Sequence, residues 1–289
     1  MLTNWGERFE RFVATKTRAA ADAGIPGLTT VDSNTDGRSL RAVGNEWTRL
    51  KFDGAFYETP AANVRQVEVS TVFVQSADGN TGTDRPIELG GGLADKHLLY
   101  EGLSSVHADA ILTGAKTIAG EQMVLGVWHP ELVSLRAQLG LPRFPIQVVA
   151  TRSGLLEIDT ALLYNVPELR VVILTGDAGA EVLRPMVEDR RWITVISGGA
   201  DSDIERGLDV LKMDFGVNRV SCIGGRTLVT PLIDSGVISD VYLTTSPKAG
   251  GEPGTPFYTG DTPPTTHTIV RKHGRGAEQG VVFEHLVIV

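Results

Sequence analysis

Cysteine is nearly absent from the 289-residue sequence, and its histidines are scattered. The single thiol, Cys222, cannot form an intramolecular disulfide and cannot supply a cysteine-rich metal site. None of the six histidines falls at the spacing of a His-Glu-x-x-His motif or a similar set of ligands. The sequence therefore predicts no metal centre, and we expect each histidine to be a surface or structural residue.

Long apolar runs and an excess of positive charge are also missing. The longest apolar runs, such as 171–174 and 281–283, are far shorter than the ~20 residues that cross a bilayer as a helix. The chain starts without the basic and then apolar pattern of a secretory signal. Its 27 Lys and Arg residues against 35 Asp and Glu residues give a formal charge of −8, with no evident face for nucleic acid or an anionic membrane. We therefore expect a cytoplasmic protein that binds neither.

Three frequent motifs of nucleotide-binding and hydrolytic enzymes are absent as well. No Gly-x-Gly-x-x-Gly opens the first strand–helix unit, and no P-loop is present. These absences exclude the Rossmann dehydrogenase and P-loop nucleotidase templates. The sequence also lacks the Gly-x-Ser-x-Gly elbow, which disfavours a hydrolase of that type.

From residue 66 onward, short β-branched runs alternate with segments of helical character, which predicts an α/β sheet with crossover connections. The last two extended runs, 266–272 and 281–289, are too close for a crossover helix and should pair antiparallel. We therefore expect a mixed, mostly parallel sheet flanked by helices. The predicted strands are 67–75, 110–114, 146–151, 170–175, 192–196, 219–223 and 241–246, and the predicted helices are 94–104, 130–139, 178–189, 201–215 and 227–235.

The first 65 residues have a different character from the rest of the chain. Residues 4–23 can form an amphipathic helix, whereas 24–62 is polar and rich in Gly, Asp and Asn. We interpret 1–65 as a helix followed by an irregular arm packed on the α/β body, and 66–289 as the main domain.

The strongest candidate site is the segment 222–228, where a predicted strand ends at Gly224 and Gly225 and a helix begins at once. Adjacent glycines let the backbone approach a ligand closely, and the helix start supplies unpaired N–H groups and the positive end of a dipole. This pattern is suited to a pyrophosphate. A tight strand-to-helix turn without a ligand explains it equally well.

Two further turns follow predicted strands. In 151–154, Arg152 stands between the hydroxyls of Thr151 and Ser153, an arrangement that can hold the phosphate monoester by which NADP differs from NAD. A solvated turn is the alternative. In 112–117, a strand ends at a glycine, and small and hydroxyl residues follow. A nucleotide cofactor lying across several strand ends would use all three turns together.

Acidic chemistry is expected after the first strand of the main domain. Asp78 is our candidate general acid for reduction of an imine or carbonyl, and Ser76, on the same face of the strand, is a candidate substrate contact. The alternative for Asp78 is that it caps the turn that it forms with Gly79. The loop 250–257 is either a surface loop or the rim of a pocket.

Five motifs in this order resemble the reductase domain of riboflavin biosynthesis, which is the C-terminal domain of bacterial bifunctional deaminase-reductases. The resemblance covers residues 67–289 and rests on the order of the motifs, because none is specific alone. It implies a dihydrofolate-reductase-like fold. The motifs are 76–79, 108–117, 151–154, 224–228, and 236–241 with 246–247.

The resemblance implies an NADPH-dependent reductase, usually a homodimer, that delivers hydride to a ring-opened ribosylamino-pyrimidine phosphate. Asp78 would lie near the substrate and the nicotinamide, and Arg85 and Lys96 would help to hold the sugar phosphate. The single cysteine cannot provide the ligands of the family's zinc deaminase domain. The implied cofactor-binding residues are Gly114 and Thr117 beside the pyrophosphate, Thr151, Arg152 and Ser153 at the adenosine 2′-phosphate, and Gly224, Gly225, Arg226, Thr227 and Leu228 at the pyrophosphate.

The chain departs from the family pattern at three places. Ile223 stands where the family commonly has Glu, Ser239–Asp240 replaces an Asp-Glu pair, and 80–85 is less basic than a sugar-phosphate pocket would suggest. Two alternative functions follow: a non-catalytic, NADPH-binding or scaffolding relative, and a dihydrofolate or pterin reductase. Fold alone cannot choose among them.

Overall fold

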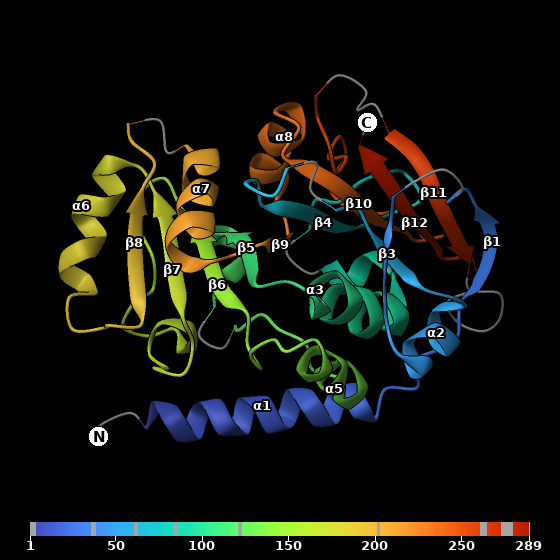
Figure 1. Ribbon diagram of the computed structural model, residues 1–289, viewed down its shortest axis with the longest axis horizontal. Coiled ribbons are helices and arrows are strands. Elements are labelled where there is room, and N and C mark those ends of the chain that lie inside the picture. Colours follow the sequence, from blue (N-terminus) through green and yellow to red (C-terminus); the bar gives the residue numbers. More distant parts are fainter. Residues whose placement is uncertain are drawn as a thin grey trace.

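A computed structural model describes residues 4–35, 39–60, 63–83, 86–120, 123–200, 203–260, 265–272 and 280–288. In this part of the chain, a sheet of ten strands has the order β1-β11-β12-β10-β4-β9-β5-β6-β7-β8 (Figure 1). All neighbours from β10 to β8 are parallel, whereas β12, β11 and β1 join antiparallel. The predicted mixed, mostly parallel sheet with an antiparallel C-terminal pair is confirmed. The strands are β1 (Thr29–Ser33), β4 (Glu68–Gln75), β5 (Ala110–Gly114), β6 (Ile146–Ala150), β7 (Val171–Thr175), β8 (Ile193–Ser197), β9 (Arg219–Cys222), β10 (Ile238–Thr245), β11 (Thr265–Lys272) and β12 (Val282–Ile288).

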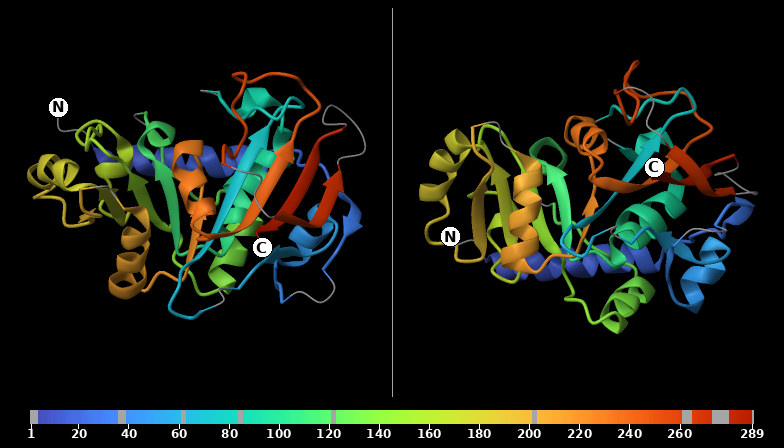
Figure 2. Two further views of the ribbon diagram at one scale, coloured as in Figure 1. Left: turned by 90° about the horizontal axis from the view of Figure 1, so that it is seen from above. Right: turned by 45° about the horizontal axis from the view of Figure 1, so that its top comes forward.

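Helices cover both faces of this sheet and enclose two apolar cores (Figures 1 and 2). On one face lie α7 (Ile204–Phe215) and α8 (Arg226–Asp234). The other face carries a π-helix, η2, with α3 and α5, and α1 packs outside them. The remaining helical bounds are α1 (Trp5–Ala21), η1 (Pro86–Leu89), η2 (Ala94–Leu103), α3 (Ser104–Val106), α4 (Ala115–Ile118), α5 (Pro130–Gln138), η3 (Leu162–Tyr164) and α6 (Asp177–Met186).

Two predicted helices differ from those in the structure, and local features of the sequence explain the differences. The helix expected from residue 201 starts at Ile204, because the Asp203 side chain accepts the Arg206 N–H and caps it. It ends at Phe215, as expected, and its C-cap Gly216 has a φ of 66°, the left-handed conformation that favours glycine. The helix expected over 94–104 is π-helical and is interrupted at Gly102, which has φ −144° and ψ −110°.

Within the described residues 24–35 and 39–60, the expectation of an irregular arm is wrong. β1 lies within it and forms the outermost strand of the main sheet, beside β11. β2 (Arg41–Val43) and β3 (Phe56–Glu58) form a separate antiparallel pair. Between them, α2 (Glu46–Phe52) begins with a capping box in which Asn45 and Thr48 exchange hydrogen bonds between side chain and backbone. Short elements of this kind were hidden by the polar composition, since capping uses polar residues.

Candidate functional site

The sequence-predicted residues gather at one edge of the sheet, because parallel strands present their carboxyl ends on the same side. The strands that carry them are neighbours in the order β4-β9-β5-β6. Ser76 and Asp78 follow β4, and the glycine pair follows β9. Gly114 ends β5, and the turn 151–154 follows β6. Ligand sites of α/β sheets commonly lie at such an edge.

The glycine pair stands between β9 and α8. A cis peptide joins Gly224 to Gly225, and Gly225 is the exposed N-cap of α8, with no capping side chain. The Gly114 N–H donates to the Gly224 carbonyl over 3.3 Å, so the turns 222–228 and 112–117 lie side by side. The backbone at the start of α8 therefore faces the open edge, with the positive end of the helix dipole.

Space beside these glycines suits a ligand that approaches the backbone. A Cβ atom placed on Gly114 would meet no heavy atom within 4 Å, and one on Gly225 would meet only the Thr117 hydroxyl, at 3.9 Å. The fold itself thus leaves room at both positions. Thr227 is exposed at the same edge, whereas Arg226 is half-buried and Leu228 is buried in the core, with its N–H donated to the Gly225 carbonyl.

The turn after β6 is partly structural. Thr151 is buried, and its hydroxyl accepts the Gly154 N–H; the Ser153 hydroxyl accepts the Leu155 N–H. Gly154 has φ +70° and packs so tightly on α6 that a Cβ there would lie 2.7 Å from the Gly179 carbonyl oxygen. Arg152 and Ser153 are exposed. The turn therefore presents a guanidinium at the carboxyl edge on a rigid backbone.

The acidic and hydroxyl candidates after β4 differ in exposure and in the groups that they contact. Asp78 is exposed, and its Oδ2 accepts the Gly250 N–H over 3.2 Å. Ser76 is fully buried, and its hydroxyl accepts the Asn80 N–H. The contact of Asp78 thus reaches a distant loop and not the turn formed with Gly79.

The two cationic candidates have different outcomes. Lys96 is half-buried in the first turn of η2. The adjacent Asp95 accepts the Thr244 hydroxyl over 2.5 Å, which fixes this turn near the carboxyl end of β10. Arg85 lies outside the described residues.

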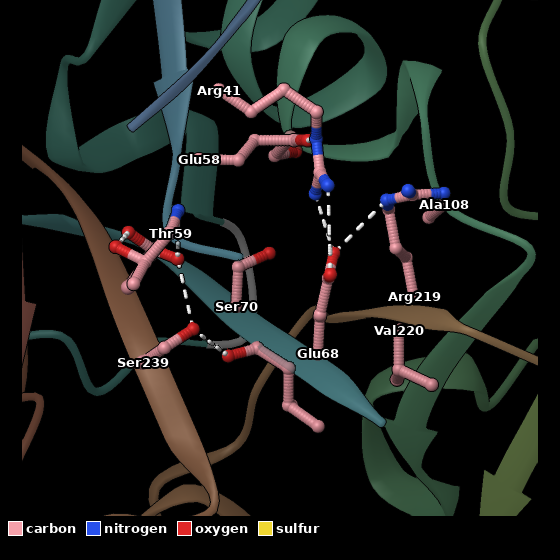
Figure 3. A pocket seen from close by; sticks show the side chains of 12 residues that line it. Arg41, Glu58, Thr59, Glu68, Ser70, Ala108, Arg219, Val220 and Ser239 are labelled. Atoms are coloured by element: carbon pink, nitrogen blue, oxygen red, sulfur yellow. Dashed lines mark hydrogen bonds and ion pairs between the residues drawn. The ribbon is translucent and has the colours of Figure 1, made fainter. Parts of the chain in front are cut away.

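A second polar cluster, which sequence reasoning missed, lies at the opposite edge of the sheet. Glu68, at the start of β4, lies between the guanidinium groups of Arg41 and Arg219, at 2.5 and 3.0 Å (Figure 3). Arg41 also contacts Glu58 of β3. Burial by itself would lower the pKa of the Arg41 guanidinium, but hydrogen bonds and charge from Glu68 and Glu58 outweigh it and raise that pKa.

This cluster anchors the N-terminal segment, since Arg41 and Glu58 belong to β2 and β3, whereas their partners belong to the main sheet. Thr59 continues the contact by donating its N–H and its hydroxyl to the buried Asp240 carboxylate, which also binds His285 at 2.7 Å. No sequence signal links these residues, because they lie up to about 180 positions apart.

No group of His, Cys, Asp and Glu side chains suited to a metal ion occurs among the residues that the structure describes. Within the same residues, no helix has the length and apolar character needed to cross a membrane.

Comparison with known proteins identifies the fold and the family. A family profile described as the RibD C-terminal domain matches residues 68–282, more than half of the chain. A search of curated proteins finds no match. The structure is similar to that of a pyrimidine reductase-like protein from Corynebacterium diphtheriae, with 16% identity and a TM-score of 0.57 over 77% of this chain and 92% of that one.

Two other solved structures are also similar in fold to this chain. RibD of Acinetobacter baumannii is 17% identical, with a TM-score of 0.59 over 78% of this chain and 58% of that one. The riboflavin biosynthesis reductase Rib7 of Saccharomyces cerevisiae is 16% identical, with a TM-score of 0.55 over 79% of this chain and 93% of that one. These similarities confirm the dihydrofolate-reductase-like fold that was predicted. Because the family profile matches residues 68–282, the chain belongs to the RibD C-terminal domain family.

Proposed function

We propose that this protein is an NADPH-dependent reductase of riboflavin biosynthesis, acting on a ring-opened ribosylamino-pyrimidine phosphate. Membership of the RibD C-terminal domain family supports a reductase. The observation that carries the cofactor assignment is the open backbone at Gly114 and Gly225, which lie side by side at the carboxyl edge of the sheet.

Strand order gives the proposed cofactor a direction. The pyrophosphate residues follow β9 and β5, and Arg152 follows β6, one strand further out. Neighbouring strands are ~4.8 Å apart, so from β9 to β6 is about 10 Å along the edge. With its 2′-phosphate at β6, the cofactor would extend its reactive end the other way, toward β4 and β10. Asp78, Ser76 and Lys96 lie at that end.

When bound, NADPH supplies the hydride. The role left to the chain is to hold the cofactor backbone at the glycine turns, orient the substrate beside β4, and exclude water. Arg152 would pair with the 2′-phosphate through charge-assisted hydrogen bonds. Asp78, exposed at the substrate end, would donate the proton that accompanies reduction.

Titration with NADPH and NADH, followed by turnover assays, tests this proposal. We expect tight NADPH binding, weaker NADH binding, and NADPH oxidation with ribosylamino-pyrimidine phosphate. Oxidation with dihydrofolate alone would assign the dihydrofolate reductase activity. Binding without turnover on either substrate would assign the non-catalytic relative, and no binding of either nucleotide would refute the cofactor site.

The homodimer implied by the family resemblance is part of the same proposal. Light scattering of the purified chain measures its mass directly. A mass of twice the 31.0 kDa chain is expected.

A further inference from the structure

A long segment after β10 folds back over the carboxyl end of β4. Residues 246–257 start beside the last residue of β4, where the Ser246 N–H donates to the Gln75 carbonyl over 2.9 Å. Glu252 then pairs with Gly82 in an isolated antiparallel bridge. Two chain segments about 170 positions apart therefore form one layer at the end of the sheet where Asp78 lies.

Asn80 stands at the centre of the contact between these segments. Its side-chain oxygen accepts the Thr255 N–H over 3.2 Å, and its side-chain nitrogen donates to the Gly250 carbonyl over 3.3 Å. Both polar atoms of the Asn80 side chain are thus hydrogen-bonded to the segment 246–257. Its own N–H donates to the buried Ser76 hydroxyl, which ties the turn to β4. The asparagine amide places an acceptor and a donor on two separate atoms at the end of a single methylene group, so one side chain can bind both partners at once.

The neighbouring bonds complete the contact. Buried Thr255 receives the Gly82 N–H on its hydroxyl, and its carbonyl accepts both the N–H and the hydroxyl of Thr81. Asp78 also accepts the Gly250 N–H. Backbone groups at this end of the sheet are thereby paired between the two segments, which holds them in one fixed arrangement.

The same segment reaches the glycine turn. The Phe257 ring lies 6.0 Å from the Phe73 ring, centroid to centroid. Phe73 in turn touches Gly224, where a Cβ would lie 3.4 Å from its ring. The segment therefore spans the distance from the end of β10 to the candidate pyrophosphate site, across the end of β4.

We propose that Asn80 is a positioning residue that locks 246–257 in place as the outer wall of the substrate end. This inference rests on the proposed function, because strand order puts the reactive end of the cofactor beside β4. Asn80 contacts neither cofactor nor reacting atoms in this assignment. It fixes the wall against which the substrate is oriented, so its loss should weaken substrate use and leave cofactor binding intact.

Hydrogen exchange of the full chain, read by NMR or mass spectrometry, tests the lock without any substrate. In Asn80→Ala, the Thr255 N–H loses its acceptor, and we expect amides of 250–257 to exchange about 10-fold faster. Asn80→Asp keeps that acceptor but places a carboxylate against the Gly250 carbonyl, so it should fall between Ala and the native chain. Asn63→Ala, an exposed asparagine before β4, is the matched control and should change nothing at 250–257.

Steady-state kinetics of the same variants test the role of the wall. We expect the substrate KM of Asn80→Ala to rise about 10-fold, with kcat and the NADPH Kd within about twofold of native values. Unchanged exchange, or faster exchange with an unchanged KM, overturns the inference. A parallel rise in KM and NADPH Kd overturns it too, because the whole edge has then loosened. A native chain that binds NADPH but reduces no pyrimidine refutes the proposed function, while exchange still decides whether Asn80 holds the segment.

Discussion

Replacing Gly114 with alanine separates what the fold needs from what a ligand needs. Gly114 ends β5 with φ −79° and ψ 152°, a conformation open to any residue, and an added Cβ would meet no heavy atom within 4 Å. Alanine lowers the entropy of the unfolded chain, which favours folding by about 0.4–1 kcal/mol. Alanine is also a poorer N-cap than glycine for α4, an effect of opposite sign and about equal size. We therefore expect unfolding free energy close to that of the native chain.

Cofactor binding should respond differently. If a dinucleotide packs against this backbone, the new methyl group enters space that the ligand occupies. Overpacking by one methyl costs about 1–3 kcal/mol. Since 1.4 kcal/mol is tenfold in affinity, the NADPH Kd of Gly114→Ala should rise about 5- to 150-fold. The variant is thus predicted to fold normally and to bind NADPH poorly.

Calorimetric titration with NADPH and urea unfolding measure the two quantities. Gly27→Ala is the matched control: its Cβ also meets nothing within 4 Å, but it lies in the N-terminal segment. It should leave the NADPH Kd unchanged. Gly154→Ala provides the opposite contrast, because its positive φ and its contact with α6 predict a loss of stability. Native NADPH affinity in a stable Gly114→Ala chain would refute the placement of a cofactor at β5.

Three further predictions concern other residues. Arg152→Ala should weaken NADPH binding about 10- to 100-fold and leave NADH binding unaffected, because only NADPH carries the 2′-phosphate that pairs with Arg152. Titration with each nucleotide measures this, and equal losses of affinity for both would contradict it. Asp78→Asn keeps an acceptor for the Gly250 N–H but cannot donate an acidic proton. A fall in kcat of about 100-fold, with unchanged hydrogen exchange of 250–257, supports proton donation by Asp78. An unchanged kcat would leave Asp78 only its hydrogen bond to Gly250. Burial would raise the pKa of Glu101, but the hydrogen bond with His97 and the charge of Lys16 lower it. Because the pKa of Glu101 is lower in the folded chain than its unfolded value near 4.5, ionised Glu101 stabilises the fold at pH values above about 4.5. This contribution is lost as the pH falls through the folded pKa. Glu101→Gln should therefore flatten the acid side of the stability profile, and Lys16→Met should cost about 1–2 kcal/mol at neutral pH; urea unfolding against pH measures both.

Periodicity and turn chemistry were enough to predict the central sheet. Parallel strands such as β5 and β7 are buried β-branched runs between helices, and that pattern is local in the sequence. The glycine turns were found for the same reason, because a strand, a glycine and a helix start are adjacent in the chain. Strand order then brought the turns together at one edge.

What escaped prediction depends on contacts between distant residues. Asn80 has no unusual neighbours in the sequence, and its role appears only where Gly250 and Thr255 face it. The same holds for Glu68, whose partners come from β2 and β9. Polar composition also concealed the short strands and the helix within 24–35 and 39–60, because hydrogen-bonded caps and edge strands need few apolar residues.

The place of β1 bears on any attempt to shorten the protein. A chain beginning at residue 66 would retain the whole profile match, yet it would lose the strand that covers β11. It would also uncover Tyr242, whose ring packs 4.5 Å from Phe56. Bare strand edges and exposed aromatic surface promote association between chains. We expect such a truncated chain to aggregate on expression, and we therefore expect the folding unit to extend beyond the residues that the family profile matches.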